Sequence, residues 1–499
     1  MKFRRQVYTT KPTFLTQTLF KIMAVGLGFT GLCAQVQAQS YSYAQAEQQV
    51  LENSYTSQAN QALQSSAKLD AEAVKGLGLP RIDLNVRAYK FHSEVDVPLN
   101  SFKQGIENAL NEKIDNQLNE WENVIPPNII GDIENGVSGV IHDGVNMVPN
   151  YANLTLQDEQ IRSSISMVMP LYTGGLLKST KQIAAIQSQR SELNTEQQQD
   201  VQRFEMIQAY FNVQLQQQLL KSSQFNFNAM QRHLDNALKL EKQGFLSKGQ
   251  RMQFEVARNN AQRLLQNAQA NLQSSQFQLN NLLRTNQVNQ LTTPLFVNKA
   301  QTQSLDNLMA TYPEQSSLVR KMQMDTQIAN ENVRAQQAAK KPNLFAFGEY
   351  SLDDKENWIV GIAARYNLFS GIDKSKSIHS AELKRYATEL LTARTKQEIE
   401  NVLNKSYSEL HSAQQTHSLL LQNQKAAQEN LRIQELSFKE DMGTATQVID
   451  AQNALNALDS EMALNAYKYI LSLATLLQSH GSISNFKAYV NQPNTDFIR

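Results

Sequence analysis

Residues 169–175 read Met-Pro-Leu-Tyr-Thr-Gly-Gly, and a related run, Tyr-Asn-Leu-Phe-Ser-Gly, occupies residues 366–371. Each run ends a stretch in which apolar and polar residues alternate, and each precedes a long segment rich in Gln, Ala and Leu. Alternation is typical of a half-buried strand, whereas apolar residues at steps of three and four are typical of a helix. The chain therefore contains one strand-to-helix pattern twice, and an internal repeat of this kind decides the fold class.

Working outward from these runs, we expect two structural repeats, residues 39–300 and 301–499. The first repeat is expected to contain strands at about 80–94 and 158–172, a loop insertion at 95–158 and a helical hairpin at 176–285. The second is expected to contain strands at about 342–352 and 357–369 and a helical hairpin at 372–479. The fold class is thus mainly α with a smaller β part.

The expected helices are unusually long. From Leu176 to about Gln243 there is no Pro and no Gly, and at 1.5 Å per residue this segment would extend about 100 Å. The last helix has apolar residues at steps of three and four, including Val448, Ala451 and Leu455. Such a narrow seam is typical of coiled-coil-like packing. We expect a layer of helices packed side by side, with one solvent-exposed face, rather than a compact globular domain.

The expected strands have two unlike faces. Trp358, Val360, Ile362 and Ala364 point to one side and are interpreted as lipid-facing. The length suits a tilted membrane-spanning strand, although an ordinary half-buried soluble sheet is the alternative from the strands alone. Four strands cannot close a barrel, which needs about eight, so a membrane-spanning chain must oligomerise. Long loops of such barrels lie outside the cell, so we expect the 95–158 insertion there.

Residues 1–38 have the pattern of a secretory signal peptide. A basic flank precedes a short apolar stretch, and Val36-Gln37-Ala38 supplies small residues for cleavage after Ala38. An uncleaved anchor is the alternative. Lipidation at Cys33 is disfavoured because the bulky Leu32 precedes it. Cleavage would remove five basic residues, no acidic one and the only cysteine, leaving a slightly acidic, thiol-free chain suited to an oxidising compartment.

Composition excludes several classes of protein. The 47 Lys and Arg nearly balance the 46 Asp and Glu, which argues against a nucleic-acid partner. A mean hydropathy of −0.47 excludes a polytopic helical membrane protein. The seven His show no metal-ligand spacing, and no phosphate-binding loop, nucleophile elbow or zinc-protease motif is present. We therefore expect no enzyme activity, no cofactor and no metal site.

Taken together, these residues resemble the TolC family of trimeric outer-membrane efflux and secretion channels. The resemblance is carried in order by Leu79-Pro80, residues 169–175, Lys341-Pro342, residues 366–371 and, most specifically, Gly-Thr-Ala-Thr-Gln-Val-Ile-Asp-Ala-Gln at 443–452. It implies a homotrimer in which four strands per chain close a 12-stranded β-barrel continuous with a trimeric α-helical barrel. The implied location is the cell outer membrane, with the helices extending into the periplasm.

The function implied by the resemblance is that of the outer-membrane channel component of a tripartite efflux or type I secretion system, a passive exit duct. Its implied partners are a periplasmic adaptor protein, an inner-membrane pump and outer membrane lipid. A periplasmic coiled-coil adaptor and a structural surface protein are the alternatives. The first would have one helical hairpin rather than two, and the second would not need alternating strands.

The resemblance also implies roles for residues at two helix breaks. It places both breaks at the periplasmic tips, where they would dock the adaptor: Gly244, Phe245, Leu246, Ser247, Met442, Gly443 and Thr444. Asp450 matches an acidic position that rings the pore aperture in the family, and Gln447 stands where a second acid is found. We therefore expect one acidic ring; a solvated helix residue is the alternative interpretation of Asp450. Asp441 stands where many relatives have Gly.

Overall fold

A computed structural model of the chain describes residues 40–90, 159–285, 290–299, 303–352, 357–369, 371–440 and 442–498, with single positions 105, 109, 110, 137, 140, 141, 144 and 147. All of these residues belong to one compact unit, Ser40–Arg499. The expected signal peptide with Cys33, Asp441, and most of the 95–158 insertion lie outside the described residues.

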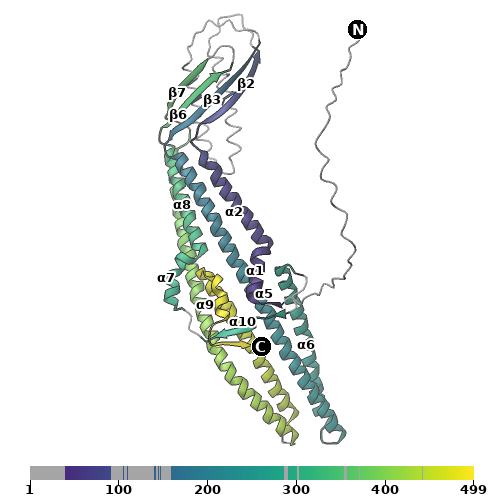
Figure 1. Cartoon of the computed structure of the whole chain (residues 1–499). Helices are drawn as coiled ribbons and strands as arrows, with labels where there is room; N and C mark the ends of the chain where they lie inside the picture. Colours follow the sequence, from purple (N-terminus) through teal and green to yellow (C-terminus); the bar gives the residue numbers. More distant parts are fainter. Residues whose placement is uncertain are drawn as a thin grey trace, which may run out of the picture. The chain divides into compact units, whose positions relative to one another are not determined.

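Two very long helices form the frame of this unit. The helices α5 (Leu176–Lys242) and α9 (Lys374–Lys439) have 67 and 66 residues, and neither contains Pro or Gly. Each is followed by a short turn and a 36-residue helix, α6 (Lys248–Leu283) or α10 (Ala445–His480). In each hairpin the two helices pack along one another (Figure 1).

Shorter helices complete the wall. They are α1 (Tyr43–Asn53), α2 (Tyr55–Ala73), α7 (Leu305–Gln315) and α8 (Ser317–Ala338), with short turns η1 (Val74–Gly76), η2 (Ile483–Asn485) and α11 (Phe486–Val490). The helix α8 packs between α5 and α9, and α2 packs on α5 (Figure 1). A serine separates α1 from α2, because Ser54 ends α1 and caps α2. A serine also separates α7 from α8, since Ser316 ends α7 and precedes α8.

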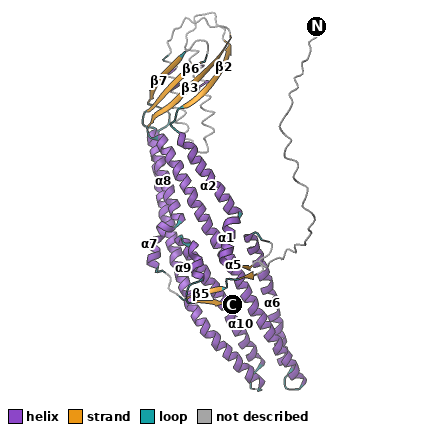
Figure 2. Cartoon of the chain, viewed as in Figure 1, coloured by secondary structure: helices purple, strands orange, loops and turns teal. Residues whose placement is uncertain are grey.

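Four antiparallel strands form the main sheet, in the order β2 (Arg81–Lys90), β3 (Glu159–Thr173), β6 (Asn343–Ser351) and β7 (Trp358–Arg365) (Figure 2). Leu84 lies opposite Ile165, Ile165 opposite Tyr350, and Tyr350 opposite Trp358. The strand expected at 357–369 ends earlier, at Arg365, because its partner β6 begins at Asn343, directly opposite. In β3 the ladder continues through a bulge between Pro170 and Tyr172.

The strand β3 leads directly into α5 through Gly174 and Gly175, which both have positive φ, 65° and 105°. A Cβ atom on Gly174 would lie 2.7 Å from the carbonyl oxygen of Ala338 at the end of α8. Glycine is therefore required here both by conformation and by close approach. This turn joins the sheet to the helices.

Large buried side chains concentrate where two small sheets cross the long helices. These sheets are parallel β1 (Ser40–Tyr41) with β4 (Gln290–Leu291), and antiparallel β5 (Leu295–Asn298) with β8 (Thr495–Ile498). The aromatic cluster comprises Tyr43, Tyr210, Phe211, Phe296, Tyr469 and Phe486. Ring centroids are 5.1 Å apart for Tyr43 and Phe486 and 5.7 Å apart for Phe211 and Phe296, distances at which aromatic pairs attract.

Candidate functional site: the sheet faces and the hairpin tips

One face of the main sheet is apolar and exposed. It carries the large side chains of all four strands, namely Ile82, Leu84, Val86, Ile165, Tyr350, Trp358, Val360 and Ile362. Their register places them in rows across the sheet, and Ala364 shares this face. Contiguous exposed apolar surface of this kind marks contact with a membrane or another protein. The four side chains interpreted as lipid-facing, at 358, 360, 362 and 364, therefore lie together on this outer face.

The opposite, inner face is polar toward one end of the strands. The side-chain amide of Asn85 donates to Ser166 Oγ at 2.9 Å, and Ser164 Oγ donates to Glu349 Oε1 at 2.7 Å. Arg87 Nη2 lies 4.0 Å from the same carboxylate oxygen of Glu349. Polar side chains with mutual partners are typical of a strand face that meets water.

The remainder of the inner face is apolar and packed. Phe345, Phe347 and Ala363 are buried together with Val140, which belongs to the 95–158 insertion. A Cβ atom on Gly361 would lie 2.8 Å from the ring of Phe347, so this ring occupies the space beside Gly361. Val140 packs on this inner face, where two phenylalanine rings cover its apolar side chain. The location of the insertion outside the cell stays a prediction, because most of its residues lie outside the described part of the chain.

The strands β2 and β7 form the two edges of the sheet. Each pairs with one neighbour only within the described part of the chain. An edge strand presents a row of unpaired N–H and C=O groups, which water or a further strand must satisfy.

The two hairpin tips are built alike. Ser247 accepts a hydrogen bond from the N–H of Gln250 at 3.3 Å, and the Gln250 side chain accepts from the N–H of Ser247 at 3.1 Å. Thr444 and Gln447 make the same reciprocal pair at 3.3 Å and 2.7 Å. Such a capping box satisfies backbone donors at a helix start and stabilises α6 and α10 there.

Large apolar side chains are exposed at both tips. Phe245 is 74% exposed and Met442 is 79% exposed. Gly244 has a φ of 80°, with open space where a Cβ would lie, whereas a Cβ on Gly443 would lie 3.0 Å from the backbone nitrogen of Phe438. Leu246 turns inward instead, and it packs against the cluster described next.

A small apolar cluster joins the two tips. It comprises Ala237 and Leu234 of α5, Leu246, Phe254 of α6, Phe438 of α9, and Ala445 and Ile449 of α10. The rings of Phe254 and Phe438 meet edge to face at 5.5 Å. His233 stacks on Phe254, and its Nε2 lies 3.5 Å from Glu435 Oε1. Burial lowers the pKa of His233, against the opposing effect of the Glu435 carboxylate.

The two candidate aperture residues differ in their local roles. Asp450 is exposed on α10, between the buried Val448 and Ala451 and one helical turn from the capping box, and it makes no hydrogen bond or ion pair within the described residues. The Oε1 atom of Gln447 accepts from the N–H and Oγ1 of Thr444. Gln447 therefore caps the start of α10. The resemblance to the channel family did not predict this role, although the Thr-x-x-Gln spacing was a signal for it.

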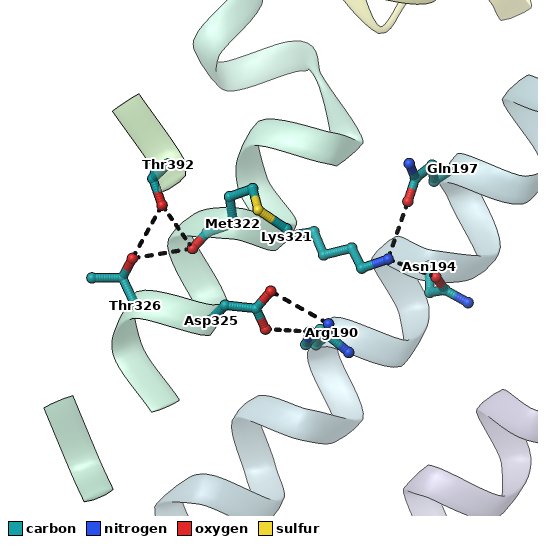
Figure 3. A network of polar contacts seen from close by, with 8 residues as sticks. All are labelled: Arg190, Asn194, Gln197, Lys321, Met322, Asp325, Thr326 and Thr392. Atoms are coloured by element: carbon teal, nitrogen blue, oxygen red, sulfur yellow. Dashed lines mark hydrogen bonds and ion pairs between the residues drawn. The ribbon is translucent and has the colours of Figure 1, made fainter. Parts of the chain in front are cut away.

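A polar network fixes α8 to both of its neighbours (Figure 3). On one side, Asp325 pairs with Arg190 of α5, and Lys321 Nζ donates to Asn194 Oδ1 at 2.9 Å and Gln197 Oε1 at 3.3 Å. Burial lowers the pKa of Lys321, and the charge of Arg190 adds to this effect.

On the other side of α8, the hydroxyls of Thr326 and Thr392 of α9 lie 3.3 Å apart, and both donate to the carbonyl oxygen of Met322 (Figure 3). These contacts join both sequence repeats at one level of the wall, so they set the axial register of three helices. Sequence reasoning missed this network because its members are far apart in the chain and follow no motif.

Within the described residues, no group of three or more His, Cys, Asp or Glu is arranged to hold a metal ion. None of the described helices has the length and hydropathy that crossing a membrane requires.

Comparison with known proteins places these features in context. Residues 312–482 match the family described as Outer membrane efflux protein. The fold is similar to that of the outer membrane protein VceC from Vibrio cholerae, with a TM-score of 0.68 and 12% identity over 88% of this chain and 96% of that chain. It is also similar to the CmeC outer membrane channel of Campylobacter jejuni, with a TM-score of 0.69 and 11% identity over 90% and 89% of the two chains.

The open state of the MtrE outer membrane channel of Neisseria gonorrhoeae gives a TM-score of 0.65 at 14% identity, over 88% of this chain and 89% of that chain. No curated protein matches the sequence. At such low identity the likeness is one of fold, and it extends over nearly the whole described chain.

Proposed function

We infer that this chain, which carries an outer membrane efflux protein domain on the fold of the TolC-type channels, is one subunit of a homotrimeric exit duct across the outer membrane and the periplasm. The observation that carries the proposal is the main sheet. It combines an exposed apolar outer face with a polar and packed inner face, and both of its edges lack a partner within the described residues.

The sheet supports assembly into a barrel. Its strands have 8 to 15 residues, against the 9 to 11 that a tilted strand needs to cross a bilayer. A closed barrel needs about eight strands, so four strands must be supplemented by other copies. Three copies give a 12-stranded barrel, in which β7 of one copy pairs with β2 of the next and no edge meets lipid.

The helices support the periplasmic part of the duct. At 1.5 Å per residue, the 67 residues of α5 extend about 100 Å from the strand-to-helix turn to the first tip. Three copies of the helical wall would continue the barrel as a tube. In this assembly the exposed Phe245 and Met442 offer apolar contacts to the helical hairpin of a periplasmic adaptor, which links the duct to an inner-membrane pump.

The second tip supports a single acidic ring at the periplasmic aperture. Asp450 is exposed and unpaired within the described residues, and three copies would place three carboxylates around the pore axis. Converging carboxylates concentrate negative potential and favour cations. Gln447 is engaged with Thr444 and contributes no charge.

The proposal includes export of the chain by a signal peptide at residues 1–38. Its removal after Ala38 would also remove Cys33. Nothing in the proposed role requires chemical catalysis, because the duct only conducts what the pump delivers.

The proposal is tested by the membrane fraction, the detergent requirement and the mass of the purified chain. We expect it to fractionate with outer membranes, to require detergent for solubility and to have the mass of a trimer by light scattering corrected for bound detergent. A folded monomer that stays soluble without detergent would overturn the proposal. That result would favour a periplasmic adaptor or a surface coiled coil instead.

A further inference from the structure

The two antiparallel strand pairs at the ends of the main sheet have the same register. Arg81 lies opposite Val168 in the first pair, β2 with β3, and Asn343 lies opposite Arg365 in the second, β6 with β7. Arg81 and Asn343 each directly follow a proline, and Val168 and Arg365 each stand three residues before the leucine of the repeated turn run. The sheet therefore keeps the internal repeat of the sequence residue by residue, and each strand pair is one copy of the same unit.

These two units meet once within the chain. There β3 of the first unit pairs with β6 of the second, and Val168 lies opposite Phe347. The equivalent contact, from the end of a second unit to the start of a first unit, requires β7 and β2, which are the two edges of the sheet. The edges of a four-stranded sheet cannot pair with each other, because a closed barrel needs about eight strands. The equivalent contact therefore requires two copies of the chain.

The register of β3 with β6 predicts the register of this contact between copies. Strands alternate in direction across the sheet, so β7 and β2 run antiparallel, as β3 and β6 do. Carrying each β3–β6 pair over to the corresponding residues of the repeat places the following residues of β7 and of the next copy's β2 opposite each other: Ala364 with Val86, Arg365 with Asn85, Tyr366 with Leu84, and Asn367 with Asp83. Ala364 and Val86 both belong to the outer face, so this register keeps that face continuous, whereas a slip by one residue would not.

The side chains on the inner face at this contact match in kind. Within the chain Val168 faces Phe347, and both are apolar. At the equivalent place between copies Arg365 faces Asn85, and both are polar. The next inner pair changes in the same way, from Pro170 and Phe345 to Asn367 and Asp83. Arg365 Nη1 is buried without a hydrogen-bond partner among the described residues, and the side-chain oxygen of Asn85 would offer it an acceptor.

The strand β7 ends earlier than its counterpart in the first repeat. In the first repeat β3 continues through the turn run to Thr173, because β6 pairs with it that far. In the second repeat the strand ends at Arg365, and residues 366–369 have no strand partner within the described part of the chain. Leu368 and Phe369 are 89% and 90% exposed there. A neighbouring β2 would supply the partner that this segment lacks.

We propose that β7 of one copy pairs with β2 of the next in the register of β3 with β6, and that residues 366–369 become the last part of β7 when they do so. The proposal rests on the proposed function, because its partner is a second copy of this chain. Each copy then presents β7 on one side and β2 on the other. Such a head-to-tail contact closes into a ring when the rotation between copies permits, and no edge strand then remains unpaired.

Disulfide formation between copies tests the register. Residues 39–499 contain no cysteine, so paired substitutions provide the only thiols of the cleaved chain. Directly opposite residues have Cβ atoms about 4.5–5.5 Å apart, which suits a disulfide, whereas residues shifted by two are about 7–8 Å apart. Ala364→Cys with Val86→Cys, oxidised in outer-membrane fractions, should give covalent dimers and trimers on a non-reducing denaturing gel. The matched controls, Ala364→Cys with Ala88→Cys or with Leu84→Cys, keep the same face and should give at least about fivefold less.

A second pair tests the extension of the strand. Tyr366→Cys with Leu84→Cys lies beyond the present end of β7, and it should link to within about twofold of the yield of the first pair. If only the first pair links, the extension is wrong.

The remaining outcomes separate this proposal from the proposed function. Predominant linking of a shifted pair overturns the register, although copies would still pair β7 with β2 as the duct requires. The absence of linking from every pair, in a protein with the mass of a trimer, overturns the pairing of these two edges. A monomeric protein would overturn the proposed function itself, and this proposal with it.

Discussion

Replacing Val360 by Arg tests whether the outer sheet face meets lipid. Val360 is 70% exposed, and it lies opposite Gly348 in the middle of β6. An arginine on the lipid face of a barrel costs about 2–4 kcal/mol near the bilayer midplane. Since about 1.4 kcal/mol corresponds to a factor of ten, we expect the equilibrium between folded, inserted protein and unfolded protein to fall by roughly thirty- to a thousandfold.

The control is the same substitution at Val256, which is 60% exposed on α6. This residue lies on the helical wall, where a charged side chain reaches water, and surface changes of this kind usually stay within about 0.5 kcal/mol. The assay is refolding into lipid vesicles across a urea series, with the folded fraction read from heat-modifiable gel mobility. Equal midpoints for the two variants, or a lower midpoint for Val256→Arg, would refute the assignment of the outer face to lipid.

Three further predictions concern the tips. Phe245→Glu and Thr444→Asp should abolish efflux while trimer abundance is unchanged, since Asp preserves the helix cap; loss of the trimer would show that these are folding residues instead. Asp450→Asn should lower cation selectivity in single-channel recordings, and unchanged selectivity would place Asp450 outside the pore. Because burial lowers the pKa of His233 in the folded state, the unfolded state binds more protons, so stability is complete above the usual His pKa and is lost as pH falls through the lowered value. His233→Phe should therefore weaken the acid dependence of unfolding, and an unchanged pH profile would contradict this account.

Periodicity alone predicted the long helices and the alternating faces of the strands. The absence of Pro and Gly from residues 176–242 leaves no local reason for the helix to stop, and α5 continues unbroken. Alternation likewise predicted that Val360 and Ile362 share a face opposite Gly361. Both inferences depend only on local geometry, which one sequence is sufficient to reveal.

Features that depend on tertiary contacts were beyond sequence reasoning. The early end of β7 at Arg365 follows from where β6 begins, which alternation within one strand cannot show. The contacts of Asp325 with Arg190 and of Thr392 with Met322 depend on which helices become neighbours. The packing of Val140 against Phe345 and Phe347 also depends on tertiary contacts, because the length of an inserted loop says nothing about which side of the sheet its apolar residues cover.

The capping role of Gln447 could have been found in the sequence. Thr-x-x-Gln and Ser-x-x-Gln begin the two returning helices, and such spacing predicts a capping box. The side chain of Gln447 carries no charge and is taken up by its hydrogen bonds with Thr444.

The aromatic cluster gives the helices a mechanical property. Phe211 lies within it, and from there α5 continues without a break to Lys242 at the tip, a lever of about 46 Å at 1.5 Å per residue. A tilt of about 5° about the cluster would move the tip by about 4 Å at this length. A small movement of the rings around Phe211 is thus amplified into a larger movement at the far end of the hairpin. Substitutions that loosen the packing of these rings therefore change the position of the tip from a distance.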